Sequence, residues 1–146
     1  MARIHSVEIS DGSGAQSTAL KTGFPMKVRV KYLALEPLRA ASLAVYFFSP
    51  DGTLHSHLTT RTTQGYMDLP KGPGLVEFTC PELGLQPGIY NVDAAIDTAN
   101  SIDPVEHLRQ CATIRVDAGH SVRGLFYTAH QCRVCQEQNS VKLSRE

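Results

Sequence analysis

Two histidines in the middle of the chain have a spacing that could hold a metal ion. His55 and His57 are two residues apart, so on a β-strand their imidazoles project from the same face. They could ligate a metal if a carboxylate such as Asp93 faced them from another strand. An exposed polar strand that merely carries histidines explains the same residues. Because the spacing supplies no third ligand, we predict no metal site here.

Cys132 and Cys135 form a CxxC pair near the end of the chain. One such pair supplies half of a tetrahedral zinc site, for which His130 and His120 are the nearest further ligands in sequence. A thioredoxin-type redox motif would need a helix start beside a parallel sheet, which this sequence does not predict. We interpret the pair as incidental cysteines of a mobile tail, with metal binding as the second interpretation. We accordingly predict neither a metal nor a cofactor.

The sequence contains no pattern that predicts catalysis. No Ser-His-Asp arrangement can be assembled from the spacing, and the G-x-S-x-G motif of a nucleophile elbow is absent. Gly12-Ser13-Gly14 is followed by no helix and is therefore not a phosphate-binding loop. Carboxylates such as Asp93 and Asp97 are not recognisable as a pair for acid–base work. We predict that the protein is not an enzyme.

The clearest binding signal is a set of aromatic and polar side chains expected on the outward face of the middle strands. Aromatic rings, amides, carboxylates and guanidinium groups are the chemistry of a glycan-binding groove. An ordinary solvated sheet face would carry many of the same residue types, and the chain has no Trp. Exposed aromatic patches usually have a partner, which also leaves open a structural module or a dimer interface built on Phe48. The predicted ligand-binding residues are Tyr46, Phe48, His55, His57, Arg61, Asn91, Asp93 and Arg115.

The elements that would position these residues are strands, because the hydrophobic period is two. From Met26 to Tyr32 apolar and charged residues alternate strictly, and Pro50-Asp51-Gly52 predicts the turn of an antiparallel hairpin. The strands are expected over residues 4–9, 26–32, 43–49, 53–62, 75–80, 89–97 and 108–117, with a chain break at 71–74. No convincing helix interrupts them. We predict an all-β, antiparallel β-sandwich, Ig-like or jelly-roll-like, of about 7–9 strands, with a barrel as the alternative.

Length and composition agree with one soluble globular domain. The chain has 146 residues, and its 14 Lys and Arg balance 14 Asp and Glu. Neutrality argues against nucleic acid and anionic membranes as partners. The first residues lack the apolar core of a signal peptide and the cysteines are sparse, so we expect a reducing compartment.

In order and spacing, several segments resemble the C-terminal domain of Wzt-type ABC transporter ATPases. They are Ile4–Ile9 with Asp11-Gly12, Thr22–Val30, Phe48–Gly52 and Leu83–Tyr90, the last of which carries the specific Leu-x-Pro-Gly-x-Tyr pattern. The resemblance covers about residues 3–118. It implies a sandwich that binds O-polysaccharide on a concave face, recognising the modified non-reducing end, at the cytoplasmic side before export by an ABC transporter.

The resemblance also implies a homodimer in which a terminal strand can be exchanged. We expect the glycan-binding domain to span 3–118 and a C-terminal extension to span 119–146, with 122–127 as the candidate exchanged strand and a flexible tail after it. No Walker A motif occurs, so the chain is either a piece of a longer ATPase or a stand-alone relative. The site residues above rest on strand alternation and not on the resemblance.

Overall fold

A computed structural model describes residues 1–13, 19–120 and 122–136. These residues form nine strands and one short 3-10 helix. Within the described part of the chain, no helix has the length and apolar character needed to cross a membrane. The elements are β1 (Ala2–Ser10), β2 (Ala19–Lys21), β3 (Met26–Ala34), β4 (Leu38–Phe48), β5 (Leu54–Thr59), η1 (Thr60–Thr62), β6 (Met67–Leu69), β7 (Gly72–Cys80), β8 (Gly88–Thr98) and β9 (Glu106–Asp117). The predicted all-β sandwich is confirmed.

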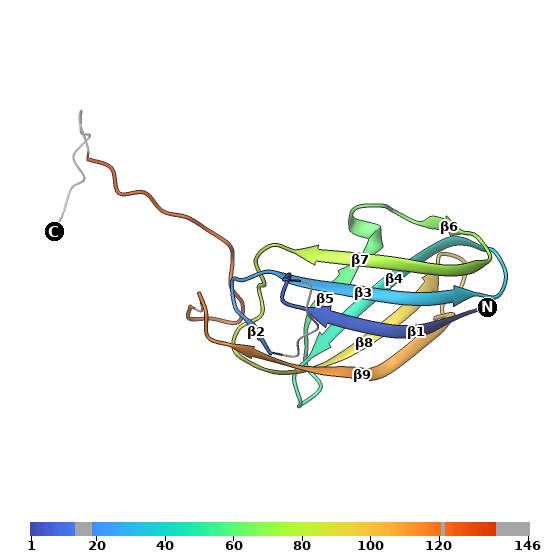
Figure 1. Ribbon diagram of the computed structural model, residues 1–146, viewed down its shortest axis with the longest axis horizontal. Helices are drawn as coiled ribbons and strands as arrows, with labels where there is room; N and C mark the ends of the chain where they lie inside the picture. Colours follow the sequence, from blue (N-terminus) through green and yellow to red (C-terminus); the bar gives the residue numbers. More distant parts are fainter. Residues whose placement is uncertain (14–18, 121, 137–146) are drawn as a thin grey trace.

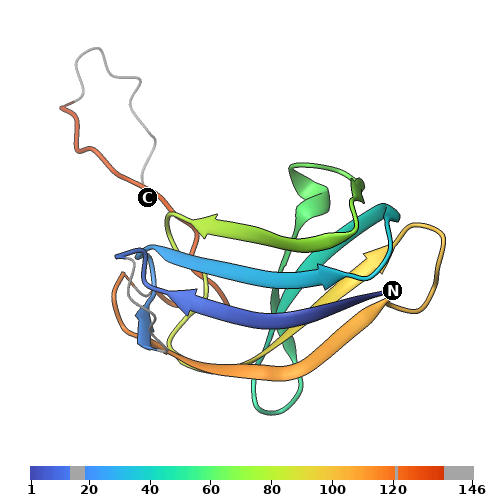
Figure 2. The same ribbon diagram turned by 45° about the vertical axis from the view of Figure 1, so that its right-hand side comes forward.

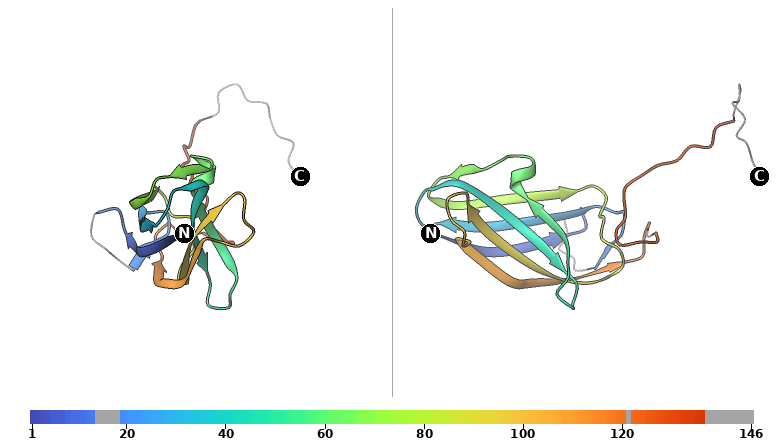
Figure 3. Two further views of the ribbon diagram at one scale, coloured as in Figure 1. Left: turned by 90° about the vertical axis from the view of Figure 1, so that its right-hand side faces the viewer. Right: turned by 180° about the vertical axis from the view of Figure 1, so that it is seen from behind.

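The strands form two sheets packed face to face (Figures 1 and 2). The small sheet has the order β1-β3-β7, and the large sheet has the order β2-β9-β8-β4-β5 with β6 paired to β4. The view from behind in Figure 3 shows the long β4–β5 hairpin and β8 crossing the back of the small sheet. The N-terminus and the C-terminal segment lie at opposite ends of the sandwich.

The core lies between the sheets and is built by the alternation seen in the sequence. Val28 and Val30 of β3 are buried, and they face Val45 and Phe47 of β4, which are buried as well. Each fully buried side chain of this size stabilises the fold by about 1.5–3 kcal/mol relative to its exposed state. Because one strand face is committed to this core, the opposite face of β4 is free to carry Tyr46 and Phe48 outward.

The chain break expected at 71–74 is wrong, because β7 begins at Gly72 and runs through Pro73 and Gly74. The strand lies at the edge of the small sheet, where a proline is tolerated. Gly74 is opposite Tyr32 of β3, and a Cβ at Gly74 would come within 2.1 Å of the Tyr32 ring. The glycine therefore makes space for a buried aromatic side chain and does not end the strand.

Three further features depart from the sequence prediction. The predicted strand 53–62 stops at Thr59, whose side chain caps the 3-10 helix by accepting a hydrogen bond from the Arg61 backbone N–H. The fully antiparallel arrangement is wrong at one edge, because β2 pairs with β9 in parallel. Neither β2 nor β6 was predicted, since a strand of three residues is too short to show a period.

Candidate functional site

The outer face of the large sheet brings most of the predicted residues together. Tyr46 of β4 is paired with His57 of β5 on one side and with Asp93 of β8 on the other. Phe48 is paired with Asn91 in the same way, two residues further along. Since facing residues in a sheet share one side of it, these side chains form a continuous surface. We call this surface the outer face.

A parallel stack of two rings lies at the centre of the outer face. The Tyr46 and His57 ring centroids are 4.6 Å apart with an angle of 1° between the planes. A ring at that distance covers one face of Tyr46, and the His107 ring lies 6.3 Å from Tyr46 as a second neighbour. Burial raises the pKa of Tyr46, and burial followed by the nearby Arg61 charge lowers the pKa of His57. Both rings are thereby held neutral near pH 7.

Asp93 is a buried carboxylate with two partners on β9. Its side chain accepts a hydrogen bond from His107 Nε2 at 3.0 Å and one from the Gln110 backbone N–H at 2.8 Å. Only 5% of Asp93 is exposed, so these bonds offset the cost of burying the charge. When the ring is neutral, donation from Nε2 of His107 to the carboxylate leaves Nδ1 as an acceptor. The pair can therefore present a fixed hydrogen-bonding group to a ligand.

Sequence alternation missed His107 and Gln110 because β9 is irregular opposite Asp93. The pairing jumps from Val92 with Ala112 to Ala94 with Leu108, which leaves three residues of β9 across from Asp93. Gln110 has a φ of 47°, in the left-handed region, and this turns its N–H toward the carboxylate. A non-glycine residue rarely adopts this conformation, and nothing in the local sequence announces it.

A hollow of about 370 Å³ lies beside Asp93, between the β4–β5 turn and the irregular part of β9. It combines an aromatic ring, an amide, a carboxylate and a guanidinium group, which come from Phe48, Asn91, Asp93 and Arg109. These groups can stack on the apolar side of a sugar and hydrogen-bond its hydroxyls. Since Tyr46 is covered by His57, Phe48 is the ring of the outer face that borders an open hollow.

Two of the predicted residues lie at the margin of the outer face. Arg61 belongs to η1, and its guanidinium donates a hydrogen bond to the Tyr66 hydroxyl at 3.1 Å. Arg115 lies toward the end of β9, where its Nε is 3.1 Å from Asp117 Oδ1. Both side chains are exposed, and both already have a partner.

The prediction that His55 and His57 share one face is wrong. A β-bulge separates Phe47, which pairs with Ser56, from Phe48, which pairs with Leu54. His55 is the extra residue of this bulge. Its ring meets the buried Tyr90 ring edge-on at 5.4 Å, while His57 stays on the outer face.

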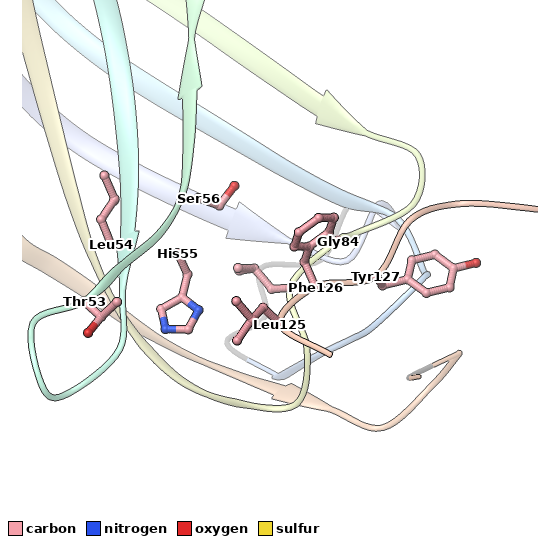
Figure 4. A pocket seen from close by; sticks show the side chains of 9 residues that line it. Thr53, Leu54, His55, Ser56, Gly84, Leu125, Phe126 and Tyr127 are labelled. Atoms are coloured by element: carbon pink, nitrogen blue, oxygen red, sulfur yellow. The ribbon is translucent and has the colours of Figure 1, made fainter. Parts of the chain in front are cut away.

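His55 instead lines a second hollow, the end pocket, of about 420 Å³ (Figure 4). One wall is the start of β5, and the opposite wall is the C-terminal segment with Leu125 and Phe126. Both of these apolar side chains are largely exposed, at 82% and 66%. In Figure 4 the Tyr127 side chain points away from the other labelled residues. The end pocket therefore combines polar residues of β5 and the turn before it, such as His55 and Ser56, with the apolar side chains of the C-terminal segment.

Residues 122–127, expected as one more strand, form a single bridge between Phe126 and Leu85 and no regular strand. The segment lies against its own chain. The Tyr127 N–H donates to the Gly84 carbonyl at 2.7 Å, and the Gln86 side chain bonds the backbone carbonyls of Val122 and Gly124. Residues 137–146, expected as the end of a flexible tail, lie outside the described residues.

Comparison with known proteins gives a family and a fold. The family model described as the Wzt C-terminal domain matches residues 1–128. A crystal structure of the C-terminal domain of Wzt superposes with a TM-score of 0.73 at 13% identity, covering 88% of this chain and 84% of that one. The CARDB domain of PF1109 from Pyrococcus furiosus, in complex with di-metal ions, gives a TM-score of 0.41 at 19% identity over 78% and 94% of the two chains. No curated protein matches the sequence.

Proposed function

Because the chain belongs to the Wzt C-terminal domain family, we propose that it is a non-catalytic module that binds bacterial polysaccharide on its outer face for export by an O-antigen ABC transporter. The observation that carries this proposal is the set of aligned groups around the hollow beside Asp93. A ring, an amide, a guanidinium group and a carboxylate held by His107 border one open space there. A preformed surface of this kind binds without first having to order its side chains.

Each group has a defined part in the proposed binding. Phe48 stacks on the apolar side of a sugar ring, while the Tyr46 and His57 stack forms a rigid wall next to it. Asn91 and Arg109 supply donors for sugar oxygens, and His107 Nδ1 accepts from a hydroxyl. The neutral net charge of the chain fits a largely neutral, polyhydroxylated ligand.

The setting of this module is part of the proposal and is supported by its family membership. It works on the cytoplasmic side, at the inner face of the membrane through the transporter components it assembles with, and as a homodimer. In an exchanged dimer, residues 122–127 would make with a partner copy the contacts that they make here with residues 84–86 of their own chain.

The test is a titration of the protein with a panel of bacterial O-polysaccharides, followed by the same titration of Phe48→Ala and Tyr46→Ala. Loss of one stacking ring removes on the order of 1.5 kcal/mol, so Phe48→Ala should weaken binding about tenfold or more. Leu75→Ala is the matched control, because Leu75 is an exposed apolar residue on the outside of the small sheet and should not affect affinity.

The alternative, an assembly module that buries the same aromatic and polar face against another protein, predicts a different result. In that case no polysaccharide binds, and Tyr46→Ala and Phe48→Ala dissociate a protein complex seen by light scattering. Equal polysaccharide affinity for the Phe48→Ala variant and the unsubstituted protein would remove the outer face as the glycan site.

A further inference from the structure

The chain after Tyr127 carries metal-binding residue types that the glycan proposal does not use. His130, Cys132 and Cys135 fall within six residues, all exposed and all beyond the region matched by the family model. Among the described residues, the hydrogen bond from the Tyr127 N–H to the Gly84 carbonyl is the last backbone bond along the chain. The residues that follow are therefore free to move relative to the sandwich.

A fourth residue of the right type, His120, is fixed on the body of the sandwich. Its backbone N–H donates to the Thr22 carbonyl at 2.8 Å, and its ring lies 4.6 Å from the Phe24 ring. Gly23 adopts a φ of 85°, and a Cβ there would come within 2.7 Å of His120. The imidazole is therefore held in a defined place while remaining exposed to solvent.

His130 lines the same hollow as His120, a space of about 470 Å³ with the Tyr127 ring between the two imidazoles. His130 Nδ1 is 2.7 Å from the Thr128 carbonyl oxygen. A carbonyl can only accept, so Nδ1 carries the proton, and in the neutral form of the ring Nε2 has a free lone pair. Histidines that ligate metals characteristically donate their other ring nitrogen to a backbone carbonyl or a carboxylate, as His130 does.

The other two cysteines are unsuited to the role. Burial raises the pKa of Cys80, and burial raises the pKa of Cys111 to about 11. The Cys111 thiol also donates to the Val92 carbonyl inside the sandwich. Thiolate ligands must come from exposed cysteines, which among the described residues leaves Cys132 and Cys135.

We propose that Cys132, Cys135, His130 and His120 bind one Zn²⁺ per chain in a tetrahedral site that closes the C-terminal segment onto the sandwich. Two thiolates at CxxC spacing with two imidazoles are a donor set that zinc prefers. In the described part of the chain no three candidate ligands are yet arranged around one point. Binding therefore draws residues 128–136 toward His120, and the two thiols each release a proton as they coordinate. This proposal is independent of the glycan proposal.

The experiment uses the full chain, reduced and freed of metal, and titrates it with Co²⁺ as a spectroscopic substitute for Zn²⁺. We expect one Co²⁺ per chain, a thiolate-to-cobalt charge-transfer band, the intense visible bands of tetrahedral Co²⁺, and displacement of both by Zn²⁺. Cys132→Ser and Cys135→Ser should each lower the intensity of the charge-transfer band and weaken binding by more than the roughly 10–100-fold lost with outer-shell partners.

The histidine variants distinguish this site from simpler alternatives. His130→Ala and His120→Ala should each weaken Co²⁺ binding at least tenfold, whereas Glu82→Gln, which alters another residue of the same hollow, and His5→Ala, at a distant exposed histidine, should not. Trypsin cleavage after Arg133, between the two cysteines, should slow when Zn²⁺ is bound.

Three results would overturn the proposal. They are a cobalt spectrum without thiolate bands, a stoichiometry of one metal per two chains that is insensitive to both histidines, and the absence of Zn²⁺ protection at Arg133. A fold check by circular dichroism accompanies each variant, so that a failure to bind is not confused with unfolding.

Discussion

The outer face and the end pocket lie on the same sandwich but are built in different ways. The outer face consists of side chains on three hydrogen-bonded neighbouring strands, with Tyr46, His57 and Asp93 in one row. The end pocket exists only because a bulge turns His55 around and the C-terminal segment closes the other side. The sheet thus maintains the first surface without help, whereas the second depends on the docking of a few residues at the end of the domain.

This difference predicts that the end pocket can be removed without loss of the outer face. Tyr127 is 7% exposed and anchors the segment that carries Leu125 and Phe126. Tyr127→Ala should lower the free energy of unfolding by about 3 kcal/mol, as expected for a buried aromatic side chain. The measurement is urea unfolding, combined with polysaccharide titration of the folded variant.

Leu125→Ala is the control for this prediction, because Leu125 is 82% exposed and should change stability by no more than about 0.5 kcal/mol. If Tyr127→Ala removed polysaccharide binding while the protein stayed folded, the two regions would not be independent. The outer face would then depend on the docked C-terminal segment.

The second prediction tests the outer face through its buried charge. Asp93→Asn keeps the size of the side chain but removes the charge that His107 and the Gln110 N–H bind. We expect a loss of about 2 kcal/mol in the free energy of unfolding, typical of hydrogen bonds to a buried charged group, together with weaker polysaccharide binding. The unfolding midpoint in urea and the polysaccharide titration measure the two effects.

Asp97→Asn is the matched change on the same strand, at a half-exposed position where, among the described residues, no group donates a hydrogen bond to the carboxylate. It should leave stability within about 0.5 kcal/mol of the unsubstituted protein. Equal losses for both variants would mean that the Asp93 and His107 pair has no special role.

Sequence alone predicted the parts of this molecule that depend on regular alternation. Tyr46, His57, Asn91 and Asp93 were expected on one face, and the regular pairing of β4 with β5 and β8 places them there. The all-β sandwich followed from the same period and from the Gly and Pro turns. Alternation predicts these positions correctly because, once every second side chain of a strand is buried in the core, the side chains between them must point to the opposite face.

The parts that sequence could not predict depend on local irregularity or on distant contacts. The bulge at His55 and the left-handed conformation of Gln110 both interrupt the two-residue alternation of side chains along a strand. No distinctive residue type marks either position in the sequence. The docking of Tyr127 on Gly84 joins segments 43 residues apart through a backbone hydrogen bond, which no side-chain pattern records. Irregularities of this kind place His107 in the candidate site and remove His55 from it.

The smallest expected effect on stability comes from the charge of Arg61, which lies near the stacked Tyr46 and His57 rings of the outer face. His57 has a lowered pKa, first because it is partly buried and second because Arg61 is near. The unfolded chain therefore binds a proton at this residue at a higher pH than the folded chain does. The contribution of His57 to stability is complete above about pH 6.5 and declines as the pH falls from there to the pKa of the folded state.

Arg61→Gln should raise the pKa of His57 and reduce this decline, as an NMR titration of the His57 ring and urea unfolding at several pH values can measure. Burial remains in the variant, so the pKa should recover only in part. Arg29→Gln, on the outside of the small sheet, is the control and should leave the His57 titration unchanged. If both substitutions shifted the pKa of His57 equally, the cause would be the net charge of the protein and not the nearby charge of Arg61.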